Sequence, residues 1–524
     1  MDRSIESHIG DFSLGHCFTL FIDWILDISQ ILNKLHIYPF MREAELFVPM
    51  LSKAASLRNL NVKISPLYVS RESTWLASLK SWNKNSFELL ITNYGFTVTD
   101  IFRVLNLNYP EIIKTEWANF KVKDLPVDIL NKIRIYLLSD DIVDHINDEI
   151  NLRHQYLIGF LKQETNLLKN SVCVDLGFRG SISLNIENSL SNAGIKSTVT
   201  HLLAFGSTSL GYLQDKGLDI RSFYSPDNKS QNLVGCIHKS LKPIEQCILG
   251  QTGSTLAYRK FSNSYTTLLD DVVIPADEIK SKTKIRESIL KFQSSWYETY
   301  NQSHSRSVFL KSPDEKSKAL EKVYRLINSP TYEEANFLGN LHHDINAGSA
   351  QLSMICSNED EKLLTRLGSN QKFLKVCRIY GIHWPQGVIA RNKFPSIIDQ
   401  KVNQNTEDCY EAAFHELLSL IKVQEIKSII VYGAGEAGKS LILKAKKLSI
   451  SVECFVDQNK ALWGLKLDGL EILSLEDAIN KFIGTPIVIA SFEFFKQIEF
   501  TITDKLQRLD YNVKIFSVNN LIDD

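Results

Sequence analysis

The stretch KSIIVYGAGEAGKSLILKAKKLSISVECFVD, residues 427–457, constrains the fold more than any other part of this chain. An apolar run over 429–432 leads into the glycine-rich segment GAGEAG. A helical pattern follows, and a second apolar run ends at Asp457. This order predicts a strand, a glycine turn, a helix and a strand. Glycines let the backbone approach a phosphate, and a helix N-terminus supplies N–H donors, so we expect a nucleotide-binding α/β unit.

The glycine turn satisfies two motifs at once. Gly433, Gly435 and Gly438 form the G-x-G-x-x-G of a dinucleotide turn. Residues 433–440 also fit the P-loop pattern G-x-x-x-x-G-K-[ST], in which Lys439 and Ser440 would meet phosphate and Mg²⁺. Both interpretations therefore need the same strand–turn–helix context, and the motif alone does not separate them.

Two features favour the dinucleotide interpretation. Asp457 follows Gly438 after about twenty residues, the spacing expected for an acid that meets ribose. Fewer than a hundred residues remain from position 427 to the end, which suits a small Rossmann-like module better than a P-loop core. We therefore expect Gly433, Gly435, Gly438 and Asp457 to bind a nucleotide-sugar or NAD(P), with Mg²⁺ as a possible companion; an ATP- or GTP-binding P-loop is the alternative.

The rest of the chain alternates strand and helix patterns, which predicts an α/β fold with a mostly parallel sheet. We expect an α/β domain over 1–400, a linker helix over 401–425 and a Rossmann-like domain over 426–524. The finer predictions are strands at 36–40, 62–70, 171–175 and 198–205, a helical insert at 124–168, an irregular region at 206–258, helices at 276–301, 313–327 and 406–421, and an unassigned polar region at 357–405.

Composition narrows the functional classes. The formal net charge of −1 argues against a protein that binds nucleic acid through bulk charge. The eight cysteines form no C-x-x-C pair, so neither a zinc site nor a disulfide framework is indicated. Residues 17–35 carry apolar side chains at three- and four-residue steps together with Asp23 and Asp27, which predicts a buried amphipathic helix. We expect a cytoplasmic protein with neither a signal peptide nor a membrane span.

Three further residues are candidates for chemistry. Asp175 ends an apolar run before a Gly-x-x-Gly-Ser turn, where backbone N–H groups suit an anion and the carboxylate suits a metal. A turn-capping role for Asp175 is the alternative. Arg42 and Arg71 each follow a predicted strand, so both are candidates to face the same crevice and bind phosphate, or to be surface arginines. We interpret the sequence His342-His343-Asp344 as a solvated loop, because adjacent side chains point apart.

Four segments over about 10–390 together resemble a family of bacterial proteins related to the haloacid dehalogenase (HAD) superfamily and associated with cell-surface polysaccharide synthesis. They are FMREA at 40–44, YVSR at 68–71, VDLGFRGS at 174–181, and the pair IE at 244–245 with GST at 253–255. The resemblance implies a HAD-like, Rossmannoid parallel-sheet domain. The catalytic D-x-D-x-(T/V) motif of active HAD phosphatases is absent from this sequence, and the family's Arg-Asp-Gly is Arg42-Glu43-Ala44 here. The sequence therefore argues against phosphoryl transfer by this domain.

The C-terminal residues 427–517 resemble the small Rossmann-like domain attached to many sugar-modifying enzymes. The glycine turn, FVDQN, LWG, LDGLEIL and a capped helix from Ser474 carry this resemblance. Together the two resemblances predict a protein of O-antigen or capsule biosynthesis whose tail binds a nucleotide or nucleotide-sugar, with glycosyltransferases of the same pathway as possible partners. A non-enzymatic assembly protein, and a residual sugar-phosphate hydrolase or transferase centred on Asp175, remain alternatives.

Overall fold

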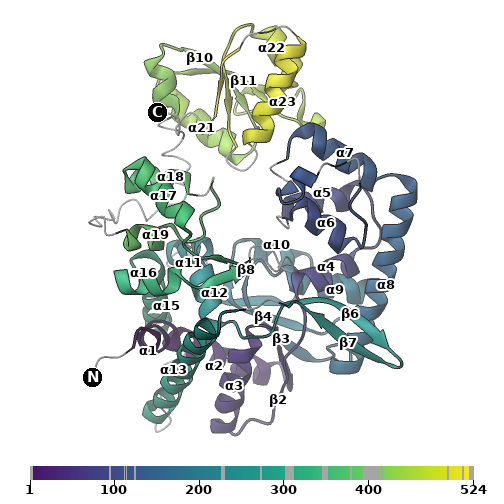
Figure 1. The fold of residues 1–524 in the computed structure, drawn as a ribbon, viewed down its shortest axis with the longest axis vertical. Helices are drawn as coiled ribbons and strands as arrows, with labels where there is room; N and C mark the ends of the chain where they lie inside the picture. The colour runs from purple at the N-terminus through teal and green to yellow at the C-terminus, as the bar shows by residue number, and fades with distance from the viewer. Residues whose placement is uncertain are drawn as a thin grey trace.

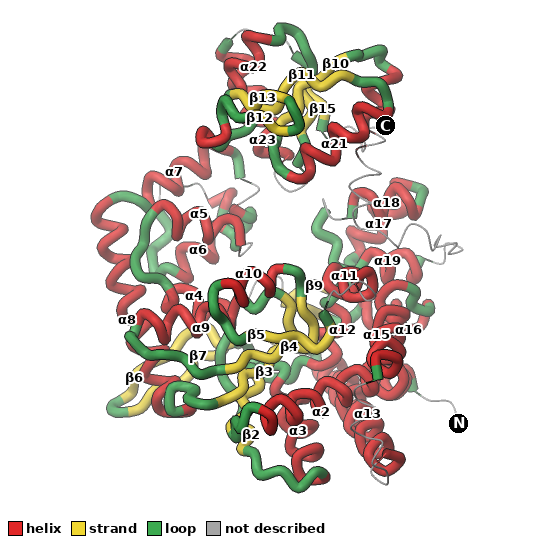
Figure 2. The backbone as a smooth tube through the Cα atoms, turned by 180° about the vertical axis from the view of Figure 1, so that it is seen from behind, coloured by secondary structure: helices red, strands yellow, loops and turns green. Residues whose placement is uncertain are grey.

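The computed structural model describes residues 4–517, except 94–95, 111–112, 114, 123–124, 226–230, 272–273, 301–311, 345–351, 378–379, 393–413, 415–416, 492–494, 510 and 512. Two parallel sheets organise these residues, and they appear as two separate groups of strands in Figure 2. The chain is thus a mixed α/β protein, as the alternating patterns predict.

The first sheet has five strands in the order β2-β1-β3-β4-β5, and every neighbouring pair is parallel. The strands are β1 (His36–Pro39), β2 (Lys63–Ile64), β3 (Ser171–Phe178), β4 (Thr200–Gly206) and β5 (Ile220–Tyr224). Because all five run the same way, their carboxyl ends share one edge of the sheet, where ligands of parallel sheets usually bind. β1 pairs with β2 on one side and with β3 on the other.

Helices cover both faces of this sheet (Figure 1). Alternate β3 side chains, Val172 and Val174 among them, join one large core with helices of one face. These helices are α2 (His16–Ile31), α3 (Ala44–Leu57), α11 (Gln231–Lys239), α12 (Lys242–Ile248), α13 (Ala276–Tyr300) and α15 (Pro313–Asn328). Cys173 points the other way, into a second cluster with α8 (Asp140–Thr165) and α9 (Ser181–Asn192). The period-two alternation along β3 thus separates the two layers.

Between β2 and β3 the chain builds a helical cap with a hydrophobic cluster of its own. The cap comprises α4 (Arg71–Trp75), η2 (Leu76–Ser78), α5 (Lys84–Asn93), α6 (Val98–Val104), η3 (Thr115–Trp117), α7 (Val127–Leu137) and the first half of α8. The predicted insert at 124–168 is therefore too short, since the helical region begins at Arg71. The predicted strand at 62–70 is correspondingly too long.

A helical lobe extends the main core beyond α15. It contains α16 (Tyr332–Gly339), α17 (Asn358–Leu367), α18 (Asn370–Val376) and α19 (Pro385–Arg391). Short hairpins accompany it: β6 (Thr255–Phe261) with β7 (Ser264–Leu269), and β8 (His342–Asp344) with β9 (Leu352–Met354). The prediction of an irregular region at 206–258 is wrong, because these residues hold α10 (Ser209–Asp215), β5, α11, α12 and the start of β6. The prediction of a loop at 342–344 is also wrong, because these residues form strand β8.

The second sheet forms a compact C-terminal module, at the top of Figure 1. Its elements are β10 (Ser428–Tyr432), α21 (Glu436–Lys447), β11 (Ser451–Val456), η5 (Lys460–Leu462), β12 (Lys466–Leu467), β13 (Leu470–Leu473), α22 (Leu475–Lys481), β14 (Ile487–Ile489), α23 (Phe495–Arg508) and β15 (Ile515–Phe516). The order is β12-β13-β11-β10-β14-β15, and only β12 is antiparallel to its neighbour. Numbered along the chain, the parallel strands run 3-2-1-4-5, the order of classical dinucleotide-binding sheets.

Local signals of the module are confirmed. Asp468 and Gly469 both have positive φ, 51° and 84°, and join β12 to β13 as the Asp-Gly signal predicts. The Ser474 hydroxyl accepts the Asp477 N–H at 3.1 Å and caps α22. The predicted linker helix lies largely outside the described residues, although 417–423 are helical.

The N-terminal helices are α1 (Ile5–His8) and the π-helix η1 (Ile9–Gly15), which continue into α2. The stretch Ile5–Ile31 is long and apolar enough to cross a membrane by length and composition. Of the window that meets this test, 83% is buried inside the protein, and a core helix meets the same test. The helical prediction for 17–35 is confirmed in type, while its end falls earlier, at Ile31.

Candidate functional site

The turn after β10 is only three residues long. Gly433 adopts φ +113°, a conformation that other residues rarely take, and its N–H donates to the Val456 carbonyl at 2.7 Å. Gly435 precedes the first residue of α21, Glu436. The N–H groups at the start of α21 therefore face the carboxyl edge of the sheet, where the positive end of the helix dipole favours an anion.

The three glycines have three different structural roles. Gly433 supplies the positive φ of the tight turn. A Cβ on Gly438 would lie 2.0 Å from the Gly433 carbonyl oxygen and 3.0 Å from the Phe455 ring, so this glycine lets α21 pack against the strands. A Cβ on Gly435 would meet nothing within 4 Å. The middle glycine thus borders open space, as a turn that admits a diphosphate requires.

Asp457 follows β11, the strand beside β10, and holds the turn in place. Its Oδ2 accepts the Ala434 N–H at 2.9 Å, and its Oδ1 accepts the Asn459 N–H at 2.8 Å. The Trp463 indole N–H donates to the Asp457 carbonyl at 2.8 Å. The predicted position of this acid next to the turn is confirmed. Its hydrogen bond to the turn itself was not foreseen.

The P-loop interpretation fits this geometry poorly. A P-loop wraps its backbone around a phosphate before the helix begins, with Lys and Ser at the helix start. Here α21 begins at Glu436, so Lys439 and Ser440 already lie inside its first turns. The strand order 3-2-1-4-5 adds to this preference for the dinucleotide-type turn.

A second group of candidates lies at the carboxyl edge of the first sheet, where the four segments quoted for the HAD resemblance meet. The Glu45 carboxylate on α3 accepts the Thr252 N–H at 3.0 Å and its hydroxyl at 2.8 Å. The Ser70 hydroxyl donates to the Thr255 carbonyl at 2.5 Å. The loop before β6 is thereby tied to the segments that follow β1 and β2.

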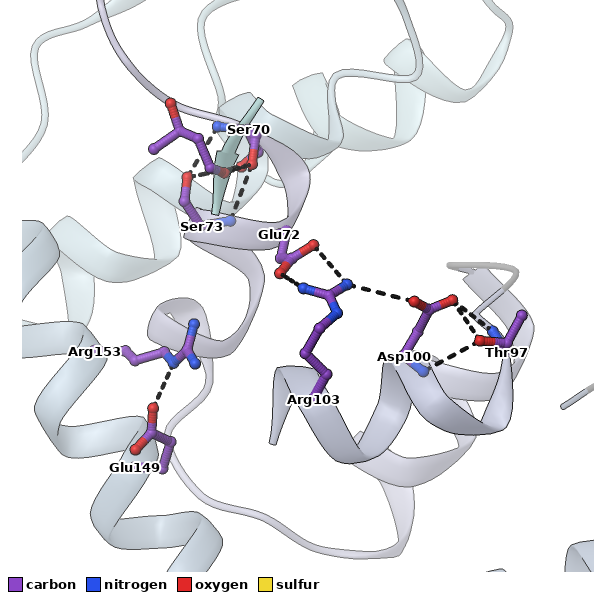
Figure 3. Close-up of polar contacts among 9 residues, drawn as sticks. Ser70, Glu72, Ser73, Thr97, Asp100, Arg103, Glu149 and Arg153 are labelled. Carbon is purple, nitrogen blue, oxygen red and sulfur yellow. Dashed lines mark hydrogen bonds and ion pairs between the residues drawn. The ribbon is translucent and has the colours of Figure 1, made fainter. Parts of the chain in front are cut away.

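Arg71 is the first residue of α4, and a polar network fixes that helix (Figure 3). Ser70 caps it by accepting the Ser73 N–H at 3.1 Å. Glu72, which is 5% exposed, forms a two-pronged ion pair with Arg103 of α6, at 2.5 and 3.2 Å. Arg103 also reaches Asp100 at 3.5 Å. The cap therefore holds Arg71 at a defined position on the sheet edge.

Asp175 lies near the end of β3, close to both Arg71 and an unforeseen acid, Glu43. Burial raises the pKa of the Asp175 carboxyl to about 7, and the charge of Glu43 adds to the rise. The N–H groups of Gly177 and Leu176 and the charge of Arg71 oppose it. A carboxyl group that titrates near neutral pH can both give and take a proton there.

Arg42 lies among a second set of charges on the same edge. Burial raises the pKa of Glu245 on α12, but Lys242, Arg42 and Arg71 outweigh it and bring the pKa to about 2. The Lys242 ammonium lies 3.1 Å from the Glu245 carboxylate. The charges of both arginines lower the pKa of Glu245, and the charge of Arg71 also opposes the rise in the pKa of Asp175. The three predicted residues, Arg42, Arg71 and Asp175, therefore lie in one neighbourhood.

The histidine pair also borders this region, which corrects the prediction of a solvated loop. His343 is only 2% exposed, and its ring lies 4.4 Å from that of His383. His342 Nδ1 lies 2.9 Å from Glu278, whose other oxygen lies 2.7 Å from the buried Lys282. Strand β8 turns the two rings to opposite sides, so that His342 meets the buried Glu278 and His343 meets the half-buried His383. Within the described ranges, no group of three or more His, Cys, Asp or Glu side chains is placed to hold a metal ion.

Five charged residues of this edge were not predicted as site residues: Glu43, Lys242, Glu245, Glu278 and Lys282. Glu278 and Lys282 stand four residues apart, which on a helix normally indicates an exposed ion pair. Nothing in their spacing distinguishes them from surface charges. Only the packing of α12 and α13 against the sheet brings them inside.

Comparison with known proteins adds one match. A family model described as C2185-like, N-terminal, matches residues 425–513, which is less than a fifth of the chain and coincides with the C-terminal module. The search of curated proteins returned no match. The matched family supports a distinct module there and says nothing about the remainder of the chain.

Proposed function

We propose that the C-terminal module binds a nucleotide or nucleotide-sugar in the turn over 433–438. The observation that carries the proposal is the division of roles among the three glycines. Gly433 allows the tight turn, Gly435 leaves open space beside the backbone, and Gly438 allows α21 to pack against the strands. This combination is what a backbone that approaches a diphosphate needs. NAD(P) and nucleotide-sugars share the diphosphate, and Mg²⁺ can accompany either.

Gly435→Val is the sharpest test, because it fills the space of the ligand while leaving the fold unstrained. Gly435 has φ −89° and ψ −167°, which valine adopts readily, and no neighbour lies within 4 Å of its Cβ position. Isothermal titration with UDP-, GDP- and CDP-sugars, NAD and NADP should show binding by the parent protein. The variant should lose at least about tenfold in affinity, equal to 1.4 kcal/mol.

Lys439→Ala is the matched control. It should change affinity by less than about twofold, since dinucleotide turns make no use of a lysine at this position. Mg²⁺-dependent ATP or GTP binding that this variant abolishes would instead establish the P-loop function. Failure of a folded parent protein to bind any of the nucleotides would overturn the proposal.

At the level of the pathway, we propose a cytoplasmic protein of bacterial cell-surface polysaccharide biosynthesis, with a degenerate HAD-like domain. Support comes from the meeting of the four resemblance segments at one sheet edge. The absence of a D-x-D-x-(T/V) motif from the sequence supports a degenerate domain, because an active HAD phosphatase needs that nucleophilic aspartate. Loss of the protein should shorten or abolish O-antigen or capsule, and tagged protein should retain glycosyltransferases; intact polysaccharide after its loss would contradict this.

A second candidate function is the binding, and residually the hydrolysis or transfer, of a sugar phosphate at the first sheet. Arg42 and Arg71 beside a carboxyl group that titrates near pH 7 favour it. Guanidinium groups pair with phosphate oxygens, and Asp175 can exchange a proton. Release of phosphate from small sugar phosphates, with or without Mg²⁺, would test it. Turnover that survives Asp175→Asn unchanged would remove Asp175 from the chemistry.

A further inference from the structure

A pocket of about 670 Å³ opens between η1, α2, α13 and α15, and its lining shares no residue with the two sites described above. Four rings line it: Phe12, His16, Phe292 and Trp296. The His16 ring lies 4.7 Å from that of Trp296, and the Phe292 ring lies 5.9 Å from it at 26°. A volume of this size suits a small organic molecule, and aromatic walls suit a flat one.

His16 gives the pocket a buried polar group. The side chain is only 4% exposed, yet within the part of the chain that the structure describes neither ring nitrogen has a hydrogen-bond partner. Glu315 Oε2 lies 3.3 Å from Nε2, outside hydrogen-bond geometry. Burial, and then the charge of Lys322, lowers the pKa of His16 to about 4, so the ring is neutral at pH 7. A buried ring without a partner is costly unless a ligand or water completes it.

The lining holds the basic side chains Lys318, Lys322 and Arg325 and the acids Glu315 and Glu321, and this excess of positive charge favours an anion. Arg325 pairs with Glu334, and Lys318 lies 2.8 Å from Glu315. Lys322 has no ion pair among the described residues, and its ammonium lies 5.3 Å from the centre of the half-exposed Phe12 ring. The charges of Lys318 and Lys322 lower the pKa of His16, and the only acid in the described part of the chain that raises it is Glu315. A ligand that lies against the rings therefore places its charged group beside Lys322.

The backbone around the pocket is specialised. The segment Ile9–Gly15 is a seven-residue π-helix, a rare conformation that usually spans a single turn and is frequent at functional sites. Cβ atoms on Gly10 and Gly15 would lie 2.6 and 2.7 Å from atoms of α13, so the two helices are in close contact. Gly15 abuts the Phe292 side chain itself. This arrangement fixes the ring wall and leaves Phe12 at the rim.

We propose that this pocket is a binding site for a planar aromatic molecule that carries one anionic group. The ring of the ligand stacks among Phe12, Phe292 and Trp296, its anionic group pairs with Lys322, and His16 supplies a hydrogen bond. The site is separate from the glycine turn and from the charged sheet edge, so it stands whether or not either of those binds a ligand.

The test uses the full chain and 1-anilinonaphthalene-8-sulfonate, an anion with a flat naphthalene ring whose fluorescence rises in an apolar site. We expect saturable binding that Lys322→Gln weakens about tenfold, which is 1.4 kcal/mol. Ser295→Phe, at an exposed position in the lining, should fill the pocket and remove the signal. Lys316→Gln is the matched control, because Lys316 lies on the same helix over a different ring, that of Phe223, at 4.7 Å.

Competition defines the ligand class. 1-Naphthoate should displace the probe at least tenfold more effectively than 1-naphthylamine, since only the former carries the anion. His16→Phe keeps a ring in the wall and removes the hydrogen bond, and it should weaken naphthoate about fivefold. Probe binding that is unchanged in both Lys322→Gln and Ser295→Phe, or equal competition by the two naphthalenes, would overturn the proposal.

Discussion

The two parallel sheets present their carboxyl edges in opposite ways. The C-terminal edge is built from backbone: a three-residue turn, a helix N-terminus and one acid that holds the turn. The N-terminal edge is built from side chains of both signs, drawn from segments up to two hundred residues apart, such as Arg42 and Glu245. If the two edges bind the ligands proposed above, the first would accept a diphosphate regardless of what is attached to it, whereas the second would select its ligand through charge and proton position.

The difference also governs how each edge tolerates change. The backbone edge depends on Gly438, whose nearest neighbour is the Gly433 carbonyl oxygen, so one added methyl group at that position disrupts it. A side-chain site depends on ion pairs that are partly exchangeable. Five variants test this contrast: the first four are taken from the largest expected effect to the smallest, and the fifth is the counterpart of the fourth.

Gly438→Ala should have the largest effect. Its new methyl group would lie 2.0 Å from the Gly433 carbonyl, and backbone on both sides has little freedom to move. We expect the C-terminal module to lose about 3 kcal/mol of stability, because α21 must move away from the strands. Gly435→Ala, which meets open space, should stay within about 0.5 kcal/mol. Denaturant unfolding followed by hydrogen exchange in 427–517 measures both, and equal losses would refute the division of roles.

Arg103→Met tests the N-terminal edge through its support. It leaves Glu72, which is 5% exposed, without its two-pronged partner. A buried carboxylate that loses its partner costs about 2–4 kcal/mol, confined here to the cap. Arg134→Met is the control, because its partner Glu88 is 43% exposed and the pair contributes under about 1 kcal/mol. Hydrogen exchange should accelerate in α4 and α6 only for the first variant; a uniform change would contradict the cap's independence.

Asp457→Asn should have a moderate effect on the C-terminal edge. An amide can accept one of the two N–H bonds, from Ala434 or Asn459, and presents its own N–H₂ to the other. We expect a loss of about 1 kcal/mol in stability and about tenfold in nucleotide affinity. Titration calorimetry gives the affinity. Unchanged affinity would mean that the turn keeps its shape without the carboxylate.

The same contrast explains which features the sequence discloses. The glycine turn, the Asp-Gly hairpin and the Ser474 cap are local, so their residue types predict their geometry, and all three are present. The choice between the two motifs required the strand order, which is not local. Glu43 and Glu245 stand inside the resemblance segments, but nothing in the sequence marks them as site residues, and only the fold brings their charges together. Likewise β8 is three residues long, too short for a period, and β5 only five.

Asp175→Asn should have the smallest effect on stability, and the informative quantity is the direction in which stability changes with pH. The folded pKa of about 7 lies above the ordinary value of 3.8, so the unfolded chain loses this proton first as pH rises. Wild-type stability therefore falls, relative to the variant, between about pH 4 and pH 7. Asp175 is half-buried by surface area, so water screens part of this shift, and we expect about 1 kcal/mol across this window.

Glu245→Gln is the counterpart of opposite sign. The Glu245 pKa is lowered to about 2, so its contribution is fully present above the ordinary value of 4.5 and is lost as pH falls below it. From pH 5 to pH 8 the difference between Glu245→Gln and wild type should be constant, while that for Asp175→Asn changes. Thermal unfolding of the three proteins at pH 5, 6.5 and 8 measures the slopes. Parallel slopes for both variants would mean that the two carboxylates do not sit in opposite fields, and the N-terminal edge would then lose its distinction as a site selective by charge.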